Sequence, residues 1–163
     1  MSTFKLIQNI TTTINIKFNL GGMNDQRRNL RSIEIYHEDS NHWEKAKINM
    51  LTERHSHGAI SHKDKVFVFG GMRYSNRLNS VEVFENGYFT ILMLPMNEAR
   101  SHFGCCKVGN KVYIVGGNTG SLNGMTNSVQ IYDLDENVWE EGVNLPNRAS
   151  EVSVCAVENK YLF

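Results

Sequence analysis

The chain has 163 residues, of which 40% are apolar and 21% are charged, a balance typical of a globular rather than a disordered protein. Seventeen basic residues offset seventeen acidic ones, which argues against a dedicated nucleic-acid binder because phosphate contacts need a basic surplus or stripe. Three cysteines cannot form a disulfide framework, and no run approaches the ~20 consecutive apolar residues of a membrane span. We therefore expect a cytoplasmic chain with neither a nucleic-acid nor a membrane partner.

Three apolar runs along the chain each end in a Gly–Gly pair. They are IKFNLGG at 16–22, VFVFGG at 66–71 and VYIVGG at 112–117, and successive pairs lie 49 and 46 residues apart. A second strand-like run follows each pair: SIEIY at 32–36, SVEVF at 80–84 and SVQIY at 128–132. An aromatic residue follows each of these runs, namely Trp43, Phe89 and Trp139. A period of about 48 residues indicates a repeat architecture.

Each repeat has the composition of a four-stranded antiparallel meander. The run at 66–69 is continuously apolar, as a strand buried on both faces should be, whereas the run at 80–84 alternates more clearly. Asn86–Gly87 is a strong signal for a type I′ hairpin turn, and it falls where the second repeat is shorter than the other two. A unit of this kind and length fits one blade of a β-propeller.

The repeats resemble those of kelch proteins, in which a double glycine is followed by a tyrosine-bearing strand and a tryptophan. LNSVEVF at 78–84 and LPMNEARSHFG at 94–104 look most like the kelch domains of BTB–kelch proteins. Those proteins act as substrate receptors of cullin-RING ubiquitin ligases. This sequence departs from the pattern at Phe84 and Phe89, which replace the usual Tyr and Trp, and no BTB segment precedes the repeats.

The predicted fold class is all-β: a kelch-type β-propeller fragment of four-stranded antiparallel blades whose ring this chain alone does not close. We expect an incomplete first blade at 1–50, a second at 51–97, a third at 98–145 and the truncated start of a fourth at 146–163. Closed propellers have about four to eight blades. The alternatives are a fragment or truncated gene model, a partial array that pairs with itself or with another propeller, and a stable open arc. Unpaired blade edges predict self-association.

Arginines recur where a loop enters a blade, at Arg54, Arg100 and Arg148. The resemblance implies that such arginines lie around one mouth of the central channel and bind acidic side chains of a peptide. A guanidinium group binds carboxylates in a bidentate manner, which suits that role. The alternative is a structural arginine that donates to a backbone carbonyl of the neighbouring blade.

Polar residues near the same mouth complete the predicted binding set. The resemblance implies that serines at the start of the third strand face the mouth, and the alternative is a local hydrogen bond at a turn or strand start. Loops after the Gly–Gly pairs supply two further candidates. The set is Ser32, Ser80, Ser128, Tyr74 and Asn118.

Histidines raise the question of a metal site. His55 and His57 alternate along one strand and so share a face, and His62 and His102 lie nearby in the repeat pattern. No cysteine accompanies them at zinc-binding spacing, so we expect surface histidines and no metal. The cysteines at 105, 106 and 155 read as small apolar residues of the blades rather than reactive thiols.

No catalytic constellation or cofactor motif is visible, and the glycine-rich loop at 116–124 lacks the lysine of a phosphate-binding loop. We therefore expect no catalytic residue, no cofactor and no enzyme. The leading hypothesis is a protein–protein interaction module, resembling the substrate-recognition kelch domain of a cullin-RING ligase adaptor. Its partner would be a protein or an acidic peptide, and also a cullin-RING ligase if a BTB domain exists upstream. Alternatives are an actin-binding or scaffolding kelch protein and a fragment of a propeller enzyme.

Overall fold

The computed structural model describes residues 16–120 and 124–157, and all regular elements in these ranges are antiparallel β-strands. The strands are β1 Lys17–Met23, β2 Asn29–His37, β3 His42–Asn49, β4 Gly58–His62, β5 Lys65–Phe69, β6 Met72–Arg73, β7 Asn76–Arg77, β8 Val81–Glu85, β9 Tyr88–Ile91, β10 Gly104–Val108, β11 Lys111–Val115, β12 Val129–Asp133 and β13 Val138–Glu141. The all-β prediction is confirmed. The described residues contain no helix that is long and apolar enough to cross a membrane.

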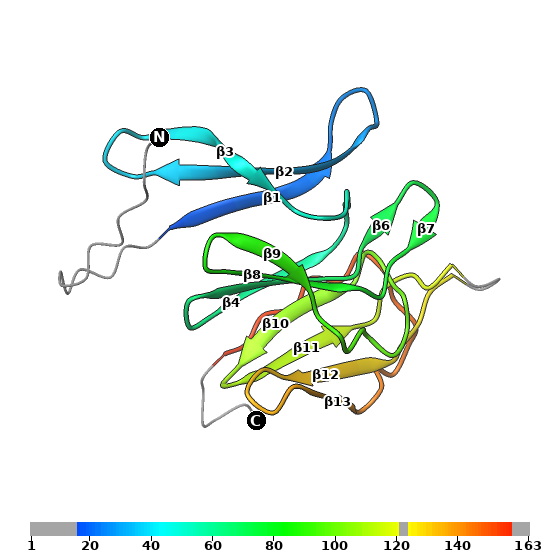
Figure 1. Cartoon of the computed structure of the whole chain (residues 1–163). Helices are drawn as coiled ribbons and strands as arrows, with labels where there is room; N and C mark the ends of the chain where they lie inside the picture. The colour runs from blue at the N-terminus through cyan, green and yellow to red at the C-terminus, as the bar shows by residue number, and fades with distance from the viewer. Residues whose placement is uncertain (1–15, 121–123, 158–163) are drawn as a thin grey trace.

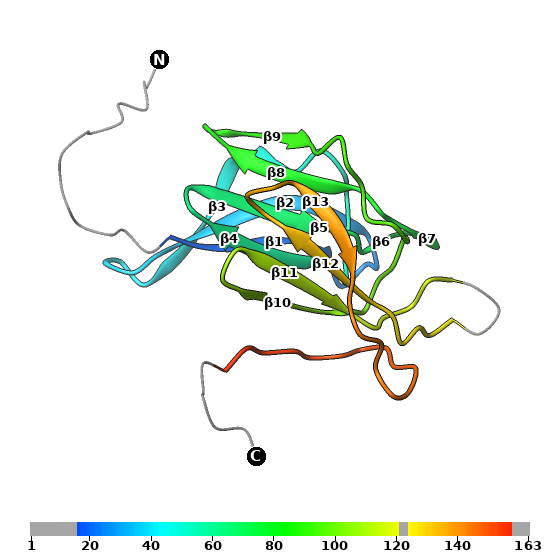
Figure 2. The ribbon, with the colours of Figure 1, turned by 90° about the horizontal axis from the view of Figure 1, so that it is seen from below.

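The strands form three successive sheets, which Figure 1 shows one beside the next. The first has three strands in the order β1-β2-β3, and the second and third have four each, β4-β5-β8-β9 and β10-β11-β12-β13. A separate two-stranded hairpin, β6-β7, lies in the loop between β5 and β8. The four-stranded antiparallel units expected from the repeats are therefore present, and Figure 2 shows their strands from below.

Strand β5 is packed on both faces, which explains its unbroken apolar sequence. Phe67 and Phe69 belong to a buried cluster that joins the second and third sheets. Val66 and Val68 point to the opposite face and pack with residues of the first sheet. The apolar cores therefore lie between neighbouring sheets, as they must in an arrangement of stacked blades.

The aromatic residues of each repeat form a cross-strand pair between the third and fourth strands of the unit. Tyr132 lies directly opposite Trp139, with ring centroids 4.8 Å apart, and the hydroxyl of Tyr132 donates to the side-chain oxygen of Asn137 in the turn. Phe84 and Phe89 form the matching pair at 5.2 Å in the second sheet. There the turn is shorter because Asn86 and Gly87 both have positive φ, at 53° and 91°, as a type I′ turn requires.

The first glycine of each Gly–Gly pair is required for two reasons: its backbone has a positive φ, and another part of the backbone lies too close for a side chain. Gly70 has a φ of 50°, and a Cβ there would lie 2.9 Å from the carbonyl oxygen of Arg100. At Gly21 the corresponding contact is 2.7 Å to the carbonyl oxygen of Arg54. Any side chain at either position would displace the linker that carries the chain into the next sheet.

Residues that follow the third sheet lie against its inner strand. The amide of Glu151 donates to the carbonyl of His102 at 2.7 Å, and Val154 occupies the space where a side chain on Gly104 would be. Figures 1 and 2 show this segment (red) beside β10. No regular strand is formed between 149 and 157, and the rest of the expected fourth unit, 158–163, lies outside the described residues, as does 1–15 of the first.

Candidate functional site

Loops after the Gly–Gly pairs and the linkers between sheets meet at one end of the strands. We call this end the loop face and define it by residues 50–57, 71–79, 96–103 and 117–120. Backbone bridges join these segments to one another: His55 pairs with Met72 and Ser101 with Asn118. The amide of His102 also donates to the carbonyl of Ser56 at 3.0 Å, which ties neighbouring linkers together.

Arg54 enters the second sheet from this face and is completely buried, with 0% of its surface exposed. Its Nη1 donates to the carbonyl oxygen of Gly70 at 2.8 Å. Its Nη2 donates to the hydroxyl of Ser80 at 3.1 Å and to Oε1 of Glu82 at 2.7 Å. Burial lowers the pKa of Arg54, while Glu82 acts in the opposite direction. The guanidinium group thus connects the linker to strands β5 and β8.

Glu82 holds the same linker through backbone contacts. Its carboxylate accepts hydrogen bonds from the amides of Leu51 and Thr52 at 2.7 and 2.8 Å, in addition to the one from Arg54. Glu82 was not among the residues predicted from the sequence. Its signal was a glutamate in the middle of the apolar run at 80–84, where only a paired charge is tolerated.

Arg100 repeats the arrangement in the third sheet with a different acid. Its Nη1 donates to the carbonyl oxygens of Gly116 and Ser128 at 3.0 and 3.1 Å, and its Nη2 donates to the Ser128 hydroxyl at 2.7 Å. The carboxylate comes from Glu98, two residues earlier in the linker, at 2.7 Å. Gln130 occupies the strand position that Glu82 has in the second sheet, and its buried Oε1 has no hydrogen-bond partner among the residues that the structure describes.

These contacts favour the structural alternative for Arg54 and Arg100. Each donates to a glycine carbonyl of the sheet it enters rather than of a neighbouring one, and neither has surface that a ligand could reach. Ser80 and Ser128 are half-buried and serve as acceptors for these arginines. Direct contact of the two arginines with a partner therefore stays a prediction that their burial does not favour.

Arg148 does not occupy the position of the other two arginines. The carbonyls of Arg54 and Arg100 accept from Gly22 and Gly71, and the matching bond from Gly117 goes to Ala149. The physical reason lies in two differences of length between the second and third units. The turn between β12 and β13 is two residues longer than the turn between β8 and β9, whereas the linker after β13 is one residue shorter than the linker after β9. The net difference of one residue puts Ala149 where Arg148 was expected. Arg148 is exposed and has no side-chain hydrogen bond among the described residues.

Tyr74 and four neighbouring residues form a polar part of the loop face in which Tyr74 and Arg73 are exposed. Tyr74 is 64% exposed in the turn between β6 and β7, and its hydroxyl lies 3.4 Å from Oε2 of Glu53. The guanidinium carbon of Arg73 lies 5.6 Å from the centre of the tyrosine ring. Arg77 bridges to the next unit, where its Nη2 donates to Oδ1 of Asn118 at 3.0 Å. We call these five residues the Tyr74 patch.

Of the predicted set, Tyr74 and Asn118 both lie on the loop face, and Arg77, which was not among the predicted residues, links the β6–β7 hairpin that carries Tyr74 to Asn118. Ser32 is half-buried on β2 and makes no side-chain hydrogen bond among the described residues. An arginine two residues after a hairpin turn gives no clear sequence signal for binding, since only the fold shows that its side chain reaches another blade.

The four histidines considered as a zinc cluster do not converge in the described structure. His55 and His102 both contact Ser56, at 3.0 and 3.1 Å, and burial lowers the pKa of His55. Burial beside Arg54 lowers the pKa of His57 to about 4. His62 lies at the opposite end of the strands.

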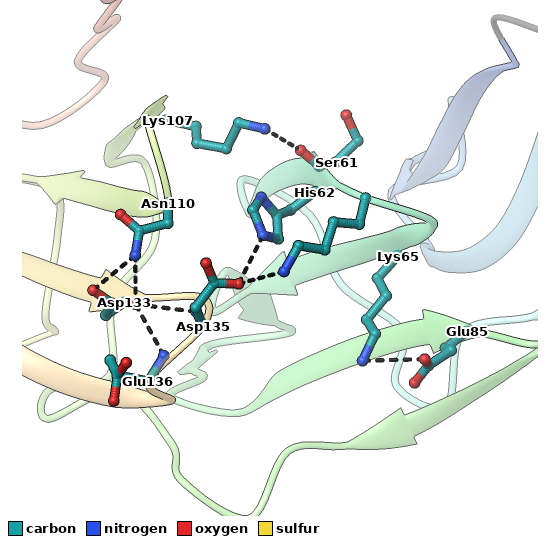
Figure 3. Close-up of polar contacts among 10 residues, drawn as sticks. Ser61, His62, Lys65, Glu85, Lys107, Asn110, Asp133, Asp135 and Glu136 are labelled. Carbon is teal, nitrogen blue, oxygen red and sulfur yellow. Dashed lines mark hydrogen bonds and ion pairs between the residues drawn. The ribbon is translucent and has the colours of Figure 1, made fainter. Parts of the chain in front are cut away.

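That opposite end carries an ionic link between the second and third sheets (Figure 3). Asp135 accepts from Lys63 at 2.6 Å and contacts Nε2 of His62 at 3.3 Å, while Nζ of Lys107 donates to the carbonyl of Ser61 at 2.9 Å. The hydrogen bonds from Lys63 and His62 lower the pKa of Asp135. Because Lys63 and Asp135 are paired with each other and Lys107 is held by a backbone carbonyl of the neighbouring sheet, we assign this link to sheet–sheet contact rather than to partner binding.

Two of the three cysteines, Cys105 and Cys106, lie on β10, and Cys155 lies in the irregular segment that follows the third sheet. Cys105 packs against the cluster between the second and third sheets, and burial raises its pKa to about 12. Burial also raises the pKa of Cys106, whereas Cys155 is exposed. The two β10 thiols are therefore packing groups at neutral pH.

Comparison with known proteins agrees with this architecture. A family model described as the KLHDC2/KLHL20/DRC7 Kelch-repeats domain matches residues 11–163. The chain belongs to the kelch-repeat family. Kelch-like protein 26 of Danio rerio is 30% identical over 143 residues, covering 84% of this chain. Kelch-like protein 22 of Rattus norvegicus is 28% identical over 108 residues, covering 62% of it.

The kelch relatives are much longer than the region matched, which is 23% of the length of the first and 17% of the second. A solved structure titled "Structure of YjhT" superposes with a TM-score of 0.69 at 13% identity, over 83% of this chain and 51% of the other. That likeness concerns the fold alone. It confirms an incomplete kelch-type β-propeller, as the repeats predicted.

Proposed function

We propose that this chain is part of a protein-interaction module that binds its partner through the Tyr74 patch. The observation that carries the proposal is an exposed tyrosine beside the guanidinium group of Arg73, in a hairpin whose Arg77 reaches Asn118 of the next kelch unit. Tyrosine and arginine are the residue types that most often dominate binding energy at protein interfaces. The similarity to kelch-like proteins supports binding rather than catalysis.

The partner that fits the patch best is an acidic peptide. The side chain of Arg73 is half-exposed, and its Nε lies 3.8 Å from Oε2 of Glu53, which is a long and therefore weak ion pair. A ligand carboxylate could take the place of Glu53. Arg148 adds a further exposed guanidinium group on a neighbouring linker. A cytoplasmic role as the substrate-recognition part of a cullin-RING ligase adaptor is the finer proposal. It rests on the resemblance to kelch domains of BTB–kelch proteins.

The test is to select peptides from a synthetic acidic library on the purified chain and to measure the affinity of each selected peptide by fluorescence anisotropy. Tyr74→Ala should weaken the selected peptide by about tenfold, the loss expected for truncating an interface anchor. Tyr88→Ala is the matched control, because Tyr88 is similarly exposed, at 59%, but lies on β9 away from the loop face. Equal affinity of the wild type and Tyr74→Ala for every selected peptide would remove the patch from the binding surface.

The adaptor role needs its own experiment. A longer natural product that contains a BTB-like segment should co-precipitate a cullin, and addition of peptide should leave that association unchanged. Failure of the cullin to co-precipitate would reject the adaptor role and leave peptide binding by the patch unaffected.

A further inference from the structure

Two histidines and a glutamate converge on the outer hairpin of the first sheet, away from the loop face. His37 is the last residue of β2 and His42 the first of β3, and the two lie directly opposite each other in the hairpin. Glu44 follows two residues after His42 and so points to the same face of β3. Their potential ligand atoms all lie within 4.8 Å of one another.

The side chains already contact one another, and the two imidazole rings face each other across the hairpin. The imidazole rings of His37 and His42 are stacked, with centroids 5.0 Å apart and planes inclined by 14°. Nε2 of His37 lies 3.1 Å from Oε2 of Glu44. Lys45 pairs with Glu34 and therefore projects from the opposite face of the hairpin, so it does not compete for the Glu44 carboxylate.

A contact in the turn fixes the orientation of one ring. The hydroxyl of Ser40 lies 2.7 Å from Nδ1 of His42. When Nδ1–H donates to this hydroxyl, the lone pair of His42 is on Nε2. A hydrogen bond from the ring nitrogen that does not bind the ion is the usual way in which proteins orient a metal-binding histidine.

We propose that His37, His42 and Glu44 bind a divalent transition-metal ion of the zinc class. Two imidazole nitrogens and one carboxylate oxygen are a known donor combination for Zn²⁺, with water completing the tetrahedron. Calcium and magnesium prefer oxygen ligands alone. Bond lengths of about 2.0–2.2 Å require the donor atoms to move closer together and one imidazole ring to turn out of the stack. The exposure of His42 and Glu44 permits both movements, and His37 is half-buried.

The ion would connect the two strands across the turn at 38–41. Because the donors come together only when β2 and β3 are paired, binding would favour the folded hairpin. This role is independent of the Tyr74 patch, which lies at the other end of the strands and in other units.

The experiment is a calorimetric titration of the metal-free full chain with Zn²⁺ alone. We expect one ion per chain, with at least about tenfold weaker binding in His42→Ala and a comparable loss in Ser40→Ala, which removes only the orienting hydroxyl. His62→Ala is the matched control, because it deletes a histidine at a different site and should leave the affinity unchanged.

A second measurement identifies the ligands in the wild type and so does not depend on the folding of a variant. Addition of Zn²⁺ should shift the imidazole NMR signals of His37 and His42 and leave those of His62 in place. Absence of binding, or equal affinity in the double variant His37→Ala/His42→Ala, would overturn the proposal. Shifts confined to His55 and His102 would also overturn it, since the ion would then lie elsewhere.

Discussion

Arg54 and Glu82 form an ion pair that is closed to water: Nη2 and Oε1 are 2.7 Å apart, and neither side chain has exposed surface. The carboxylate also accepts two backbone amides of the linker, so both charges have hydrogen-bond partners. In the third sheet the carboxylate that pairs with Arg100 comes from Glu98 of the linker, and the strand position of Glu82 is occupied by the uncharged Gln130. In both units a buried arginine paired with one carboxylate therefore holds the linker that enters the blade, and the carboxylate can come from the strand or from the linker.

Removal of the Glu82 carboxylate should destabilise the chain strongly. We expect Glu82→Ala to lower the free energy of unfolding by about 3–5 kcal/mol, because Arg54 is left buried without a countercharge. The measurement is urea denaturation followed by tryptophan fluorescence. Arg148→Ala, which removes an exposed arginine, is the control and should change stability by no more than about 0.5 kcal/mol.

A compensating pair tests the same point more sharply. Thr52 stands two residues before Arg54, as Glu98 stands two residues before Arg100. The double variant Thr52→Glu/Glu82→Gln therefore copies the third unit and should recover part of the stability lost in Glu82→Gln. If the double variant is no more stable than the single one, a linker acid cannot replace the strand acid here.

Acidification should destabilise the chain through His57. Its folded pKa is about 4, below its ordinary value of 6.5, because burial and Arg54 disfavour the charged ring. The unfolded chain thus binds a proton first, so stability is lost as pH falls from about 6.5 toward 4, by on the order of 3 kcal/mol. His57→Phe, which copies Phe103 of the next unit, should remove this part of the pH dependence. Parallel stability curves for the two proteins across that range would contradict the assignment.

Thiol labelling should separate the three cysteines. Only the thiolate reacts with iodoacetamide, and burial holds the pKa of Cys105 at about 12. At pH 8 we expect Cys155, which is exposed, to be alkylated at least about tenfold faster than Cys105. Peptide mass spectrometry at timed intervals measures the two rates. The difference should disappear in denaturant; rapid labelling of Cys105 in the native chain would show that its strand is open.

The outward face of the third sheet carries an apolar pair, which predicts how the 163-residue chain self-associates. On the first sheet, Asn19 donates to Glu34 on the face away from the second sheet. On the third sheet the corresponding outward face carries the pair Tyr113 and Ile131, both half-buried. We expect concentration-dependent oligomers in sedimentation experiments, reduced in Tyr113→Glu/Ile131→Lys but not in Asn19→Asp. A monomeric wild type at all concentrations would reject this interface.

Periodicity alone determined much of the fold. The Gly–Gly pairs, the aromatic spacing and the Asn86–Gly87 turn specify local strands and turns, and these depend on short-range backbone sterics and side-chain alternation. The unbroken apolar run at 66–69 likewise predicted a strand packed on both faces, which the clusters on its two sides confirm. Such features repeat in every unit, so each copy reinforces the interpretation of the others.

Tertiary structure alone decided what the arginines do. Spacing placed Arg148 with Arg54 and Arg100, but unequal changes in turn and linker length move it one residue away from their position. Burial of Arg54 depends on Glu82, which is 28 residues distant in sequence, and the His37, His42 and Glu44 cluster depends on which residues pair across a hairpin. A sequence pattern records residue types and spacing, whereas pairing register and burial arise only when separate strands pack together.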